Sequence, residues 1–482
     1  MIVGIQEEIL KLQSQGLLGK LLKDKTTGRN IRWASSTYCE LGSAYAPDRE
    51  ITPELITGGC SAVIKNRARK ALEKQSQRTK QHAEVFTPLA VCKRMNDDID
   101  EVWAESNPSW QKTVDSRRLE ITCGEAPFLV TRYDVSTGEH IPVSERVGIL
   151  DRKLRLVNEN TDSGSDWLRW ARRAVEASYG YEFQGDNLLI ARINLLQTFK
   201  EAFKARFNVS PPVKLLAEIA NVIVWNVWQM DGLTHAVPNT GIDEESEQLD
   251  FFAALNLNGE TSPKEETIPP CKIFDWRGKK SIAFKELKNR RKYSMKFDFI
   301  IGNPPYQEEA NGGNKTFTPP LYNQFIDNCY TLSDVVELIH PARFLFNAGS
   351  TPREWNQKML NDPHLKILHY EPNSANIFPN TDIKGGVAVT YRDINQTHDP
   401  IEIFTAFPEL NGILHKVKRH ARFSSLQEIV YSRTAHRMTK KMHEDHPNAI
   451  NQLSNGHPFD LSTNIFDRIP EIFYNEKPAA QF

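Results

Sequence analysis

The chain has 482 residues, of which 39% are hydrophobic and 25% are charged, and its formal net charge is −1. This is an ordinary globular composition with room for two or three domains, and it excludes a chain that is basic throughout. The six cysteines include no Cys-x-x-Cys pair and no apolar run approaches the ~20 residues of a membrane span, so we expect a reducing cytoplasm, no metal site and no membrane.

Residues 1–80 are predicted to form a helical extension that begins with an amphipathic helix, because Ile5, Ile9, Leu10 and the segment Leu12–Leu18 give it an apolar face. Basic side chains gather twice along the chain. The stretch Lys65–Lys80 contains seven Lys and Arg residues and one Glu. The stretch Lys416–Lys441 contains eight Lys and Arg residues and one Glu. Such clusters suit phosphate contacts or a solvated helix face, and the sequence leaves both open.

A helix is predicted to begin at Pro88, directly after Phe86 and Thr87, since proline is favoured in a first helical turn. Further along, Leu119–Leu129 has the pattern of a buried strand followed by a turn around Cys123 and Gly124. Glycine at such a turn permits a positive φ and a close approach of a ligand to the backbone.

Two carboxylates compete for the end of a second strand, where dinucleotide-binding folds hold ribose hydroxyls. Asp151 closes the run Val147–Asp151, and Glu182 closes Tyr179–Glu182. We favour Glu182, which precedes a long apolar helix, and interpret residues 131–178 as an insertion; Asp151 remains the alternative. Next, the apolar segment Leu215–Trp228 is either a third strand closed by Asp231 or a core helix capped by glycine.

The clearest stretch is Phe297–Tyr306, in which a buried strand ends at a glycine and is followed by Asn303, two prolines and Tyr306. Two prolines cannot continue a sheet, so the chain leaves the strand as a stiff loop. The Asn303 side-chain oxygen and the Pro304 carbonyl are suited to accept the two N–H groups of an exocyclic amine, and Tyr306 offers a ring on which a flipped base can stack.

Asn303-Pro304-Pro305-Tyr306 resembles the Asn/Asp-Pro-Pro-Tyr/Phe motif of S-adenosylmethionine-dependent amino-methyltransferases. The order of motifs resembles the adenine-specific (N6) DNA methyltransferases of type II restriction–modification systems. Three further pieces carry the likeness: Phe86-Thr87-Pro88, the Tyr179–Glu182 strand with its helix, and a hairpin over residues 377–391 that includes Phe378 and Lys384. The glycine turn departs from the family pattern, with Glu120 in place of Asp and Ala126 in place of the second glycine.

The resemblance implies an α/β, Rossmann-like methyltransferase fold, a mostly parallel sheet with one reversed strand and helices on both faces. It implies a catalytic domain at residues 81–408 and a C-terminal DNA-recognition region at 409–482, which we expect to be short or truncated. The implied partners are S-adenosyl-L-methionine, double-stranded DNA and a cognate restriction endonuclease. The implied site residues are Phe86, Thr87, Glu120, Thr122, Cys123, Gly124, Glu182 and Asp231 for the cofactor, Asn303, Pro304, Pro305 and Tyr306 for catalysis, and Tyr306, Phe378 and Lys384 for the target base.

Three alternatives stay open. Asp275 followed by Glu286 and Lys288 is similar to a nuclease metal site and would make the chain part of a nuclease–methyltransferase fusion. An RNA or protein-glutamine amino-methyltransferase would share the Asn-Pro-Pro-Tyr motif. A DNA-binding protein with a relic pocket is suggested by Glu120 and Ala126.

Overall fold

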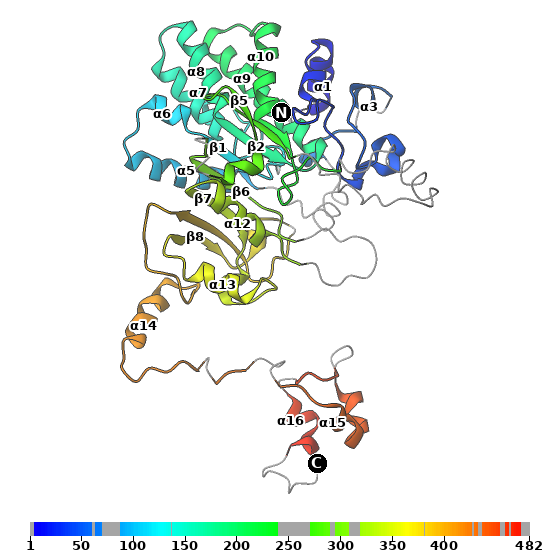
Figure 1. Ribbon diagram of the computed structural model, residues 1–482, viewed down its shortest axis with the longest axis vertical. Coiled ribbons are helices and arrows are strands. Elements are labelled where there is room, and N and C mark those ends of the chain that lie inside the picture. Colours follow the sequence, from blue (N-terminus) through cyan, green and yellow to red (C-terminus); the bar gives the residue numbers. More distant parts are fainter. Residues whose placement is uncertain are drawn as a thin grey trace, which may run out of the picture. The chain divides into compact units, whose positions relative to one another are not determined.

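The computed structural model divides the chain into two compact units, Met1–Ala406 and Phe407–Phe482, and each is considered by itself (Figure 1). The structure describes residues 4–59, 63–69, 87–135, 137–239, 270–289, 295–307, 319–379, 381–426, 429–431, 436–453, 458–461 and 464–473.

The first unit is built on a seven-stranded sheet with the order β3-β2-β1-β6-β7-β9-β8. Within this sheet only β9 is reversed, since it pairs antiparallel with both β7 and β8 while the other neighbours pair parallel. The prediction of a mostly parallel sheet with one reversed strand is therefore confirmed. The strands are β1 (Arg118–Ile121), β2 (Ser178–Glu182), β3 (Val227–Gln229), β6 (Phe299–Gly302), β7 (Val335–Pro341), β8 (Leu365–Glu371) and β9 (Val387–Asp393).

Helices cover both faces of this sheet, because its strands are apolar on both sides. In β6, Phe299 and Ile301 enter one core and Ile300 enters the other. The first core is closed by α5 (Leu89–Glu105), α7 (Ile149–Asn160), α8 (Gly164–Glu176), α9 (Gly185–Phe207) and α10 (Val213–Asn226). The second is closed by α12 (Tyr322–Leu332), α13 (Arg353–Leu360) and the hairpin of β4 (Lys272–Asp275) and β5 (Lys280–Ala283). The short helix α6 (Trp110–Asp115) precedes β1.

The interpretation of residues 131–178 as an insertion is wrong. They contain α7 and α8, which form the connection between the parallel strands β1 and β2. Parallel neighbours require such a crossover of a dozen or more residues. The segment is also part of the core, because Trp167 on α8 is buried and packs edge-on against Phe203 and Phe207 of α9.

Two ambiguous segments resolve in the structure. Leu215–Trp228 contains both proposed elements, since α10 runs to Asn226 and β3 follows at once. Residues 377–391 do not form a hairpin of their own. The hairpin pairs β8 with β9, and the stretch around Phe378 is the connection between them. The hairpin was misplaced because a local pattern cannot reveal which strand is the pairing partner.

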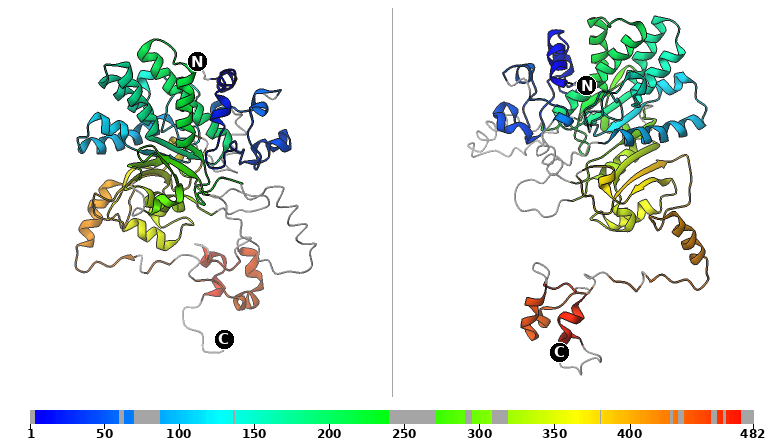
Figure 2. Two further views of the ribbon diagram at one scale, coloured as in Figure 1. Left: turned by 45° about the horizontal axis from the view of Figure 1, so that its top comes forward. Right: turned by 180° about the vertical axis from the view of Figure 1, so that it is seen from behind.

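The N-terminal segment packs on the sheet domain rather than standing apart (Figure 2). It contains α1 (Ile5–Ser14), α2 (Leu18–Leu21) and α3 (Pro53–Thr57), and α2 lies against α9 and α10. The Gln229 side chain accepts a hydrogen bond from the Arg32 N–H and donates one to the Arg32 carbonyl, both at 2.8 Å. A Cβ at Gly185 would lie 1.9 Å from that carbonyl, so the contact requires glycine at the start of α9.

The second unit contains the short helices α14 (Pro408–Lys418), α15 (Lys440–Asp445) and α16 (Ile465–Arg468), with a small core around Ala449, Ile465 and Ile469. In the described ranges, no helix has both the length and the apolar character needed to cross a membrane.

Candidate active site

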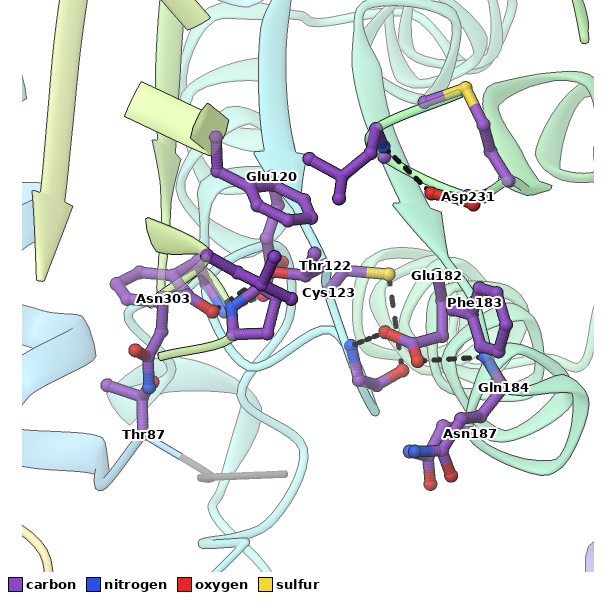
Figure 3. Close-up of a pocket in the computed structure, with 18 of the residues that line it drawn as sticks. Thr87, Glu120, Thr122, Cys123, Glu182, Phe183, Gln184, Asn187, Asp231 and Asn303 are labelled. Carbon is purple, nitrogen blue, oxygen red and sulfur yellow. Dashed lines mark hydrogen bonds between the residues drawn. The ribbon is translucent and has the colours of Figure 1, made fainter. Parts of the chain in front are cut away.

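A cavity opens where β1, β2, β3 and β6 end, at the carboxyl edge of the sheet (Figure 3). In α/β sheets this edge is where ligands bind. Nine of the residues predicted from sequence line the cavity. They are Thr87, Glu120, Thr122, Cys123, Gly124, Glu182, Asp231, Asn303 and Pro305.

The turn after β1, residues Thr122–Ala126, is called the glycine turn below. Thr122, Gly124 and Ala126 have φ values of 43°, 55° and 64°, in the left-handed region. For threonine and alanine this conformation costs about 1–2 kcal/mol each. The turn is closed by a 2.7 Å hydrogen bond from the Ala126 N–H to the Cys123 carbonyl. The chain thus keeps the left-handed turn although it lacks the second glycine.

Glu182, at the end of the neighbouring strand β2, binds this turn directly. Its carboxylate accepts hydrogen bonds from the backbone N–H of Gly124 at 2.8 Å and of Gln184 at 3.0 Å (Figure 3). The alternative, Asp151, is buried near the start of α7, where it accepts from the Thr131 N–H, and it does not line the cavity. Burial raises the pKa of Asp151 to about 6. Of the two candidates, Glu182 is the one that faces the cavity.

Glu120 and Cys123 are nearly inaccessible to solvent. The Glu120 carboxylate accepts from the N–H groups of Phe128 and Leu129, and burial raises its pKa well above the usual value. Burial also raises the pKa of the Cys123 thiol, so this thiol stays protonated and is not suited to act as a nucleophile.

Asp231 lies two residues beyond the end of β3, and its carboxylate accepts a 2.8 Å hydrogen bond from the Leu233 N–H. The intervening Gly232 packs closely against α12, since a Cβ there would meet the Phe325 ring at 2.4 Å. The loop therefore has a fixed shape, with an acidic side chain beside the apolar Leu233 and Phe325 in the cavity wall.

Asn303 is the point where three distant segments meet. Its backbone carbonyl accepts a 2.9 Å hydrogen bond from the Thr122 hydroxyl, and its side-chain amide donates to the Thr87 hydroxyl at 3.2 Å. Gly302, just before it, allows β6 to approach β1, because a Cβ there would lie 2.6 Å from an Ile121 side-chain carbon. Asn303 is thus anchored at the cavity wall through its backbone and through its side chain.

Five predicted site residues are placed elsewhere or lie outside the description. Pro304, Tyr306, Phe378 and Lys384 do not line the cavity. The Tyr306 and Phe378 rings pack edge to face, with centroids 6.4 Å apart, and Phe378 is 2% exposed. Lys384 is exposed. Phe86 lies outside the described residues.

Sequence reasoning missed part of the cavity wall. The additional lining residues include Phe183, Gln184, Asn187, Met230, Leu233 and Phe325. Phe183 and Gln184 directly follow Glu182, so their position after a predicted strand could have identified them as cavity-lining residues. Phe325, on α12, is brought in by tertiary packing alone.

The nuclease-like residues are not assembled into a metal site. Asp275 is buried and forms a 2.9 Å ion pair with Arg117, and the Lys288 ammonium donates to the Asn328 side chain. Among the residues that the structure describes, no group of three or more His, Cys, Asp or Glu side chains is placed to hold a metal ion.

Comparison with known proteins agrees with the motifs. Residues 177–378 match the family model of the Eco57I restriction-modification methylase. A protein of Mycoplasma pneumoniae (strain ATCC 29342 / M129 / Subtype 1), described as an uncharacterized adenine-specific methylase, is 30% identical over 314 residues. The match covers 63% of this chain and 65% of that relative, so the chain spans somewhat less than two thirds of its length.

Two solved structures are also similar. One is a nuclease-deletion mutant of the Type ISP restriction-modification enzyme LlaGI in complex with a DNA substrate mimic, with 17% identity, a TM-score of 0.36, and coverage of 68% of this chain and 25% of that one. The other is the ATP-dependent Type ISP restriction-modification enzyme LlaBIII bound to DNA, with 16% identity and a TM-score of 0.37. The match covers 69% of this chain and 21% of that one. The assignment of the fold rests on the strand order described above.

The family model and the curated relative confirm the resemblance to adenine-specific methyltransferases of restriction–modification systems.

Proposed function

We propose that this protein transfers a methyl group from S-adenosyl-L-methionine to N6 of adenine in double-stranded DNA, within a restriction–modification system. The observation that carries the proposal is the position of Asn303, at the carboxyl end of β6, in the wall of the cavity and anchored by Thr87 and Thr122. The matched family model includes this loop.

The cavity wall suits the proposed cofactor. Glu182 is expected to accept hydrogen bonds from the ribose hydroxyls, and Asp231 from the adenine amine. Phe183 and Leu233 supply apolar surface on which an adenine ring can pack. When bound, S-adenosylmethionine supplies an electrophilic methyl group on a sulfonium centre.

The proposed chemistry needs no covalent intermediate on the protein. The Asn303 side-chain oxygen and the Pro304 carbonyl accept the two N–H groups of the target adenine, which makes the N6 lone pair more available for attack. A donor held by Glu182 and Asp231 would supply its methyl group to N6 as the carbon–sulfur bond breaks, and N6 would then lose a proton to solvent. Positioning and electrostatics supply the catalysis, in keeping with the buried, protonated Cys123.

The target base is proposed to leave the duplex and to stack on Tyr306, with Phe378 and Lys384 beside it. The packed Tyr306 and Phe378 rings lie edge to face, so entry of a base between them requires one ring to move. The basic residues of the second unit, among them the exposed Lys416, Arg419 and Arg422, are proposed to contact DNA phosphates as part of a target-recognition region.

The test is transfer of tritiated methyl groups from S-adenosylmethionine to unmethylated bacterial DNA, with separation of the product nucleosides. We expect label in N6-methyladenosine, and none with the Asn303→Ala variant. Label in cytosine derivatives would contradict the proposal. Label that appears only when RNA or protein is supplied in place of DNA would replace it with one of the other amino-methyltransferase activities.

A further inference from the structure

Glu125 lies in the glycine turn, between Gly124 and Ala126, but does not line the cavity. It is 1% exposed, and each of its carboxylate oxygens accepts a hydrogen bond. Oε1 accepts from the backbone N–H of Arg67 at 2.7 Å, and Oε2 accepts from the Tyr133 hydroxyl at 2.8 Å. A carboxylate is an acceptor only, so the direction of both bonds is fixed.

The side chain of Asn194, on α9, binds the backbone of Glu125. Its side-chain N–H₂ group donates to the Glu125 carbonyl and to the Tyr133 hydroxyl, each at 3.0 Å. The Asn194 oxygen in turn accepts from Arg132, which is paired with Glu8 and with a second carboxylate on α9. Glu125 is therefore held at its carboxylate and at its main chain by one buried polar network.

This network surrounds Ala126, whose backbone conformation in the turn is unfavourable. Ala126 has a φ of 64° and is fully buried. A left-handed alanine is unfavourable because its Cβ approaches the carbonyl oxygen, whereas glycine adopts this conformation without strain. Without external bonds, the turn would relax toward a conformation with negative φ. Gly124, whose N–H binds Glu182, would then move.

We propose that Glu125, acting with Tyr133 and Asn194, is a positioning residue that holds the glycine turn in the shape required to bind the methyl donor. Its hydrogen bonds substitute for the conformational freedom that a glycine at position 126 would give. This inference rests on the proposed function, since the ligand is the cofactor assigned there. Glu125 itself touches neither donor nor target; it acts through Gly124 and Glu182.

The test compares the affinity for S-adenosylmethionine, measured by calorimetry without DNA, in four full-length proteins. They are the wild type, Glu125→Ala, Ala126→Gly and the double variant. Glu125→Ala is expected to weaken binding about tenfold, the effect of losing one or two buried hydrogen bonds. Adding Ala126→Gly to that variant is expected to restore affinity to within about threefold of the wild type, because glycine needs no support at positive φ. Ala126→Gly alone should bind as the wild type does.

A matched control separates relief of the turn from a general effect of glycine. Ala217→Gly, on α10, combined with Glu125→Ala, should give no recovery. If Glu125→Ala does not fold, Tyr133→Phe removes only one of the two bonds to the carboxylate and is expected to weaken donor binding about threefold.

The outcomes distinguish the two proposals. If the wild type binds the donor and Glu125→Ala and Tyr133→Phe bind it equally well, the role of Glu125 is refuted while the proposed function stands. Failure of Ala126→Gly to restore binding, or equal recovery with Ala217→Gly, refutes it as well. If the wild type does not bind the donor, the proposed function is wrong and the inference falls with it.

Discussion

The Thr122 hydroxyl donates a 2.9 Å hydrogen bond to the backbone carbonyl of Asn303, and so connects the glycine turn after β1 to the loop after β6. The two residues are 181 positions apart in the chain. Thr122 has a φ of 43°, which is unfavourable for a β-branched residue and places its side chain in reach of the neighbouring loop. The strained turn thereby positions the proposed catalytic loop.

Thr122→Val removes this hydrogen bond with little change in side-chain shape. We expect kcat for DNA methylation to fall about tenfold, because the Asn303 loop loses one of its two anchors. Thr122→Ser, which retains the hydroxyl, should stay within about threefold of the wild type. Steady-state kinetics on the two variants measure this, and equal rates for Val and Ser would contradict it.

Asn303→Ala should separate chemistry from cofactor binding. Loss of the amide acceptor is expected to lower the turnover number by at least about a hundredfold. Donor affinity should remain within a few-fold, since Glu182 and Asp231 are unchanged. Asn361→Ala, at the exposed residue directly after α13, serves as a control and should have no effect. Loss of donor binding in Asn303→Ala would contradict the catalytic role proposed for Asn303.

The two candidate ribose carboxylates are distinguished by a pair of amide variants. Glu182→Gln places an N–H₂ group near the donors of Gly124 and Gln184, so we expect donor affinity to fall roughly tenfold or more. Asp151→Asn, remote from the cavity, should leave donor affinity unchanged. Calorimetric titration of both variants decides the point, and the opposite ranking would reinstate Asp151.

His340 predicts a dependence of stability on pH. It is fully buried, and burial lowers its pKa to about 4 in the folded protein. The unfolded chain takes up this proton near pH 6.5, so it binds more protons than the folded chain between these values. The stabilisation is complete above pH 6.5 and is lost as pH falls toward 4, by up to roughly 3 kcal/mol.

Urea unfolding of the wild type and His340→Gln at pH 5 and pH 7.5 measures this contribution. The difference in unfolding free energy between the two pH values should be smaller in the variant. His235, whose pKa burial also lowers to about 4, remains in both proteins and supplies a common background. An identical pH dependence in the two proteins would assign the effect to other groups.

Local patterns predicted the sheet well because burial on both faces leaves a direct trace in the sequence. Phe299, Ile300 and Ile301 form a continuous apolar run since alternate residues enter opposite cores. The prolines after Asn303 also marked the strand end that carries the proposed site. Both signals lie within a few residues of the feature that they predict.

The rest depends on contacts that leave no local trace. The Gln229 side chain pairs with the Arg32 backbone, and Phe325 reaches the cavity from α12, but neither residue type nor spacing indicates these partners. The strand that follows α10 was ambiguous for a related reason. It has three residues, too few to establish a period of two.

The pairing of Arg32 with Gln229 also has a kinetic consequence. The two residues are 197 positions apart, so at about 5–20 residues per second the ribosome delivers Gln229 roughly 10–40 s after Arg32. For most of that interval Leu18 and Leu21 of α2 have no α9 or α10 to pack against, although both are buried in the finished protein. Docking of the N-terminal segment is therefore a late folding step of high contact order.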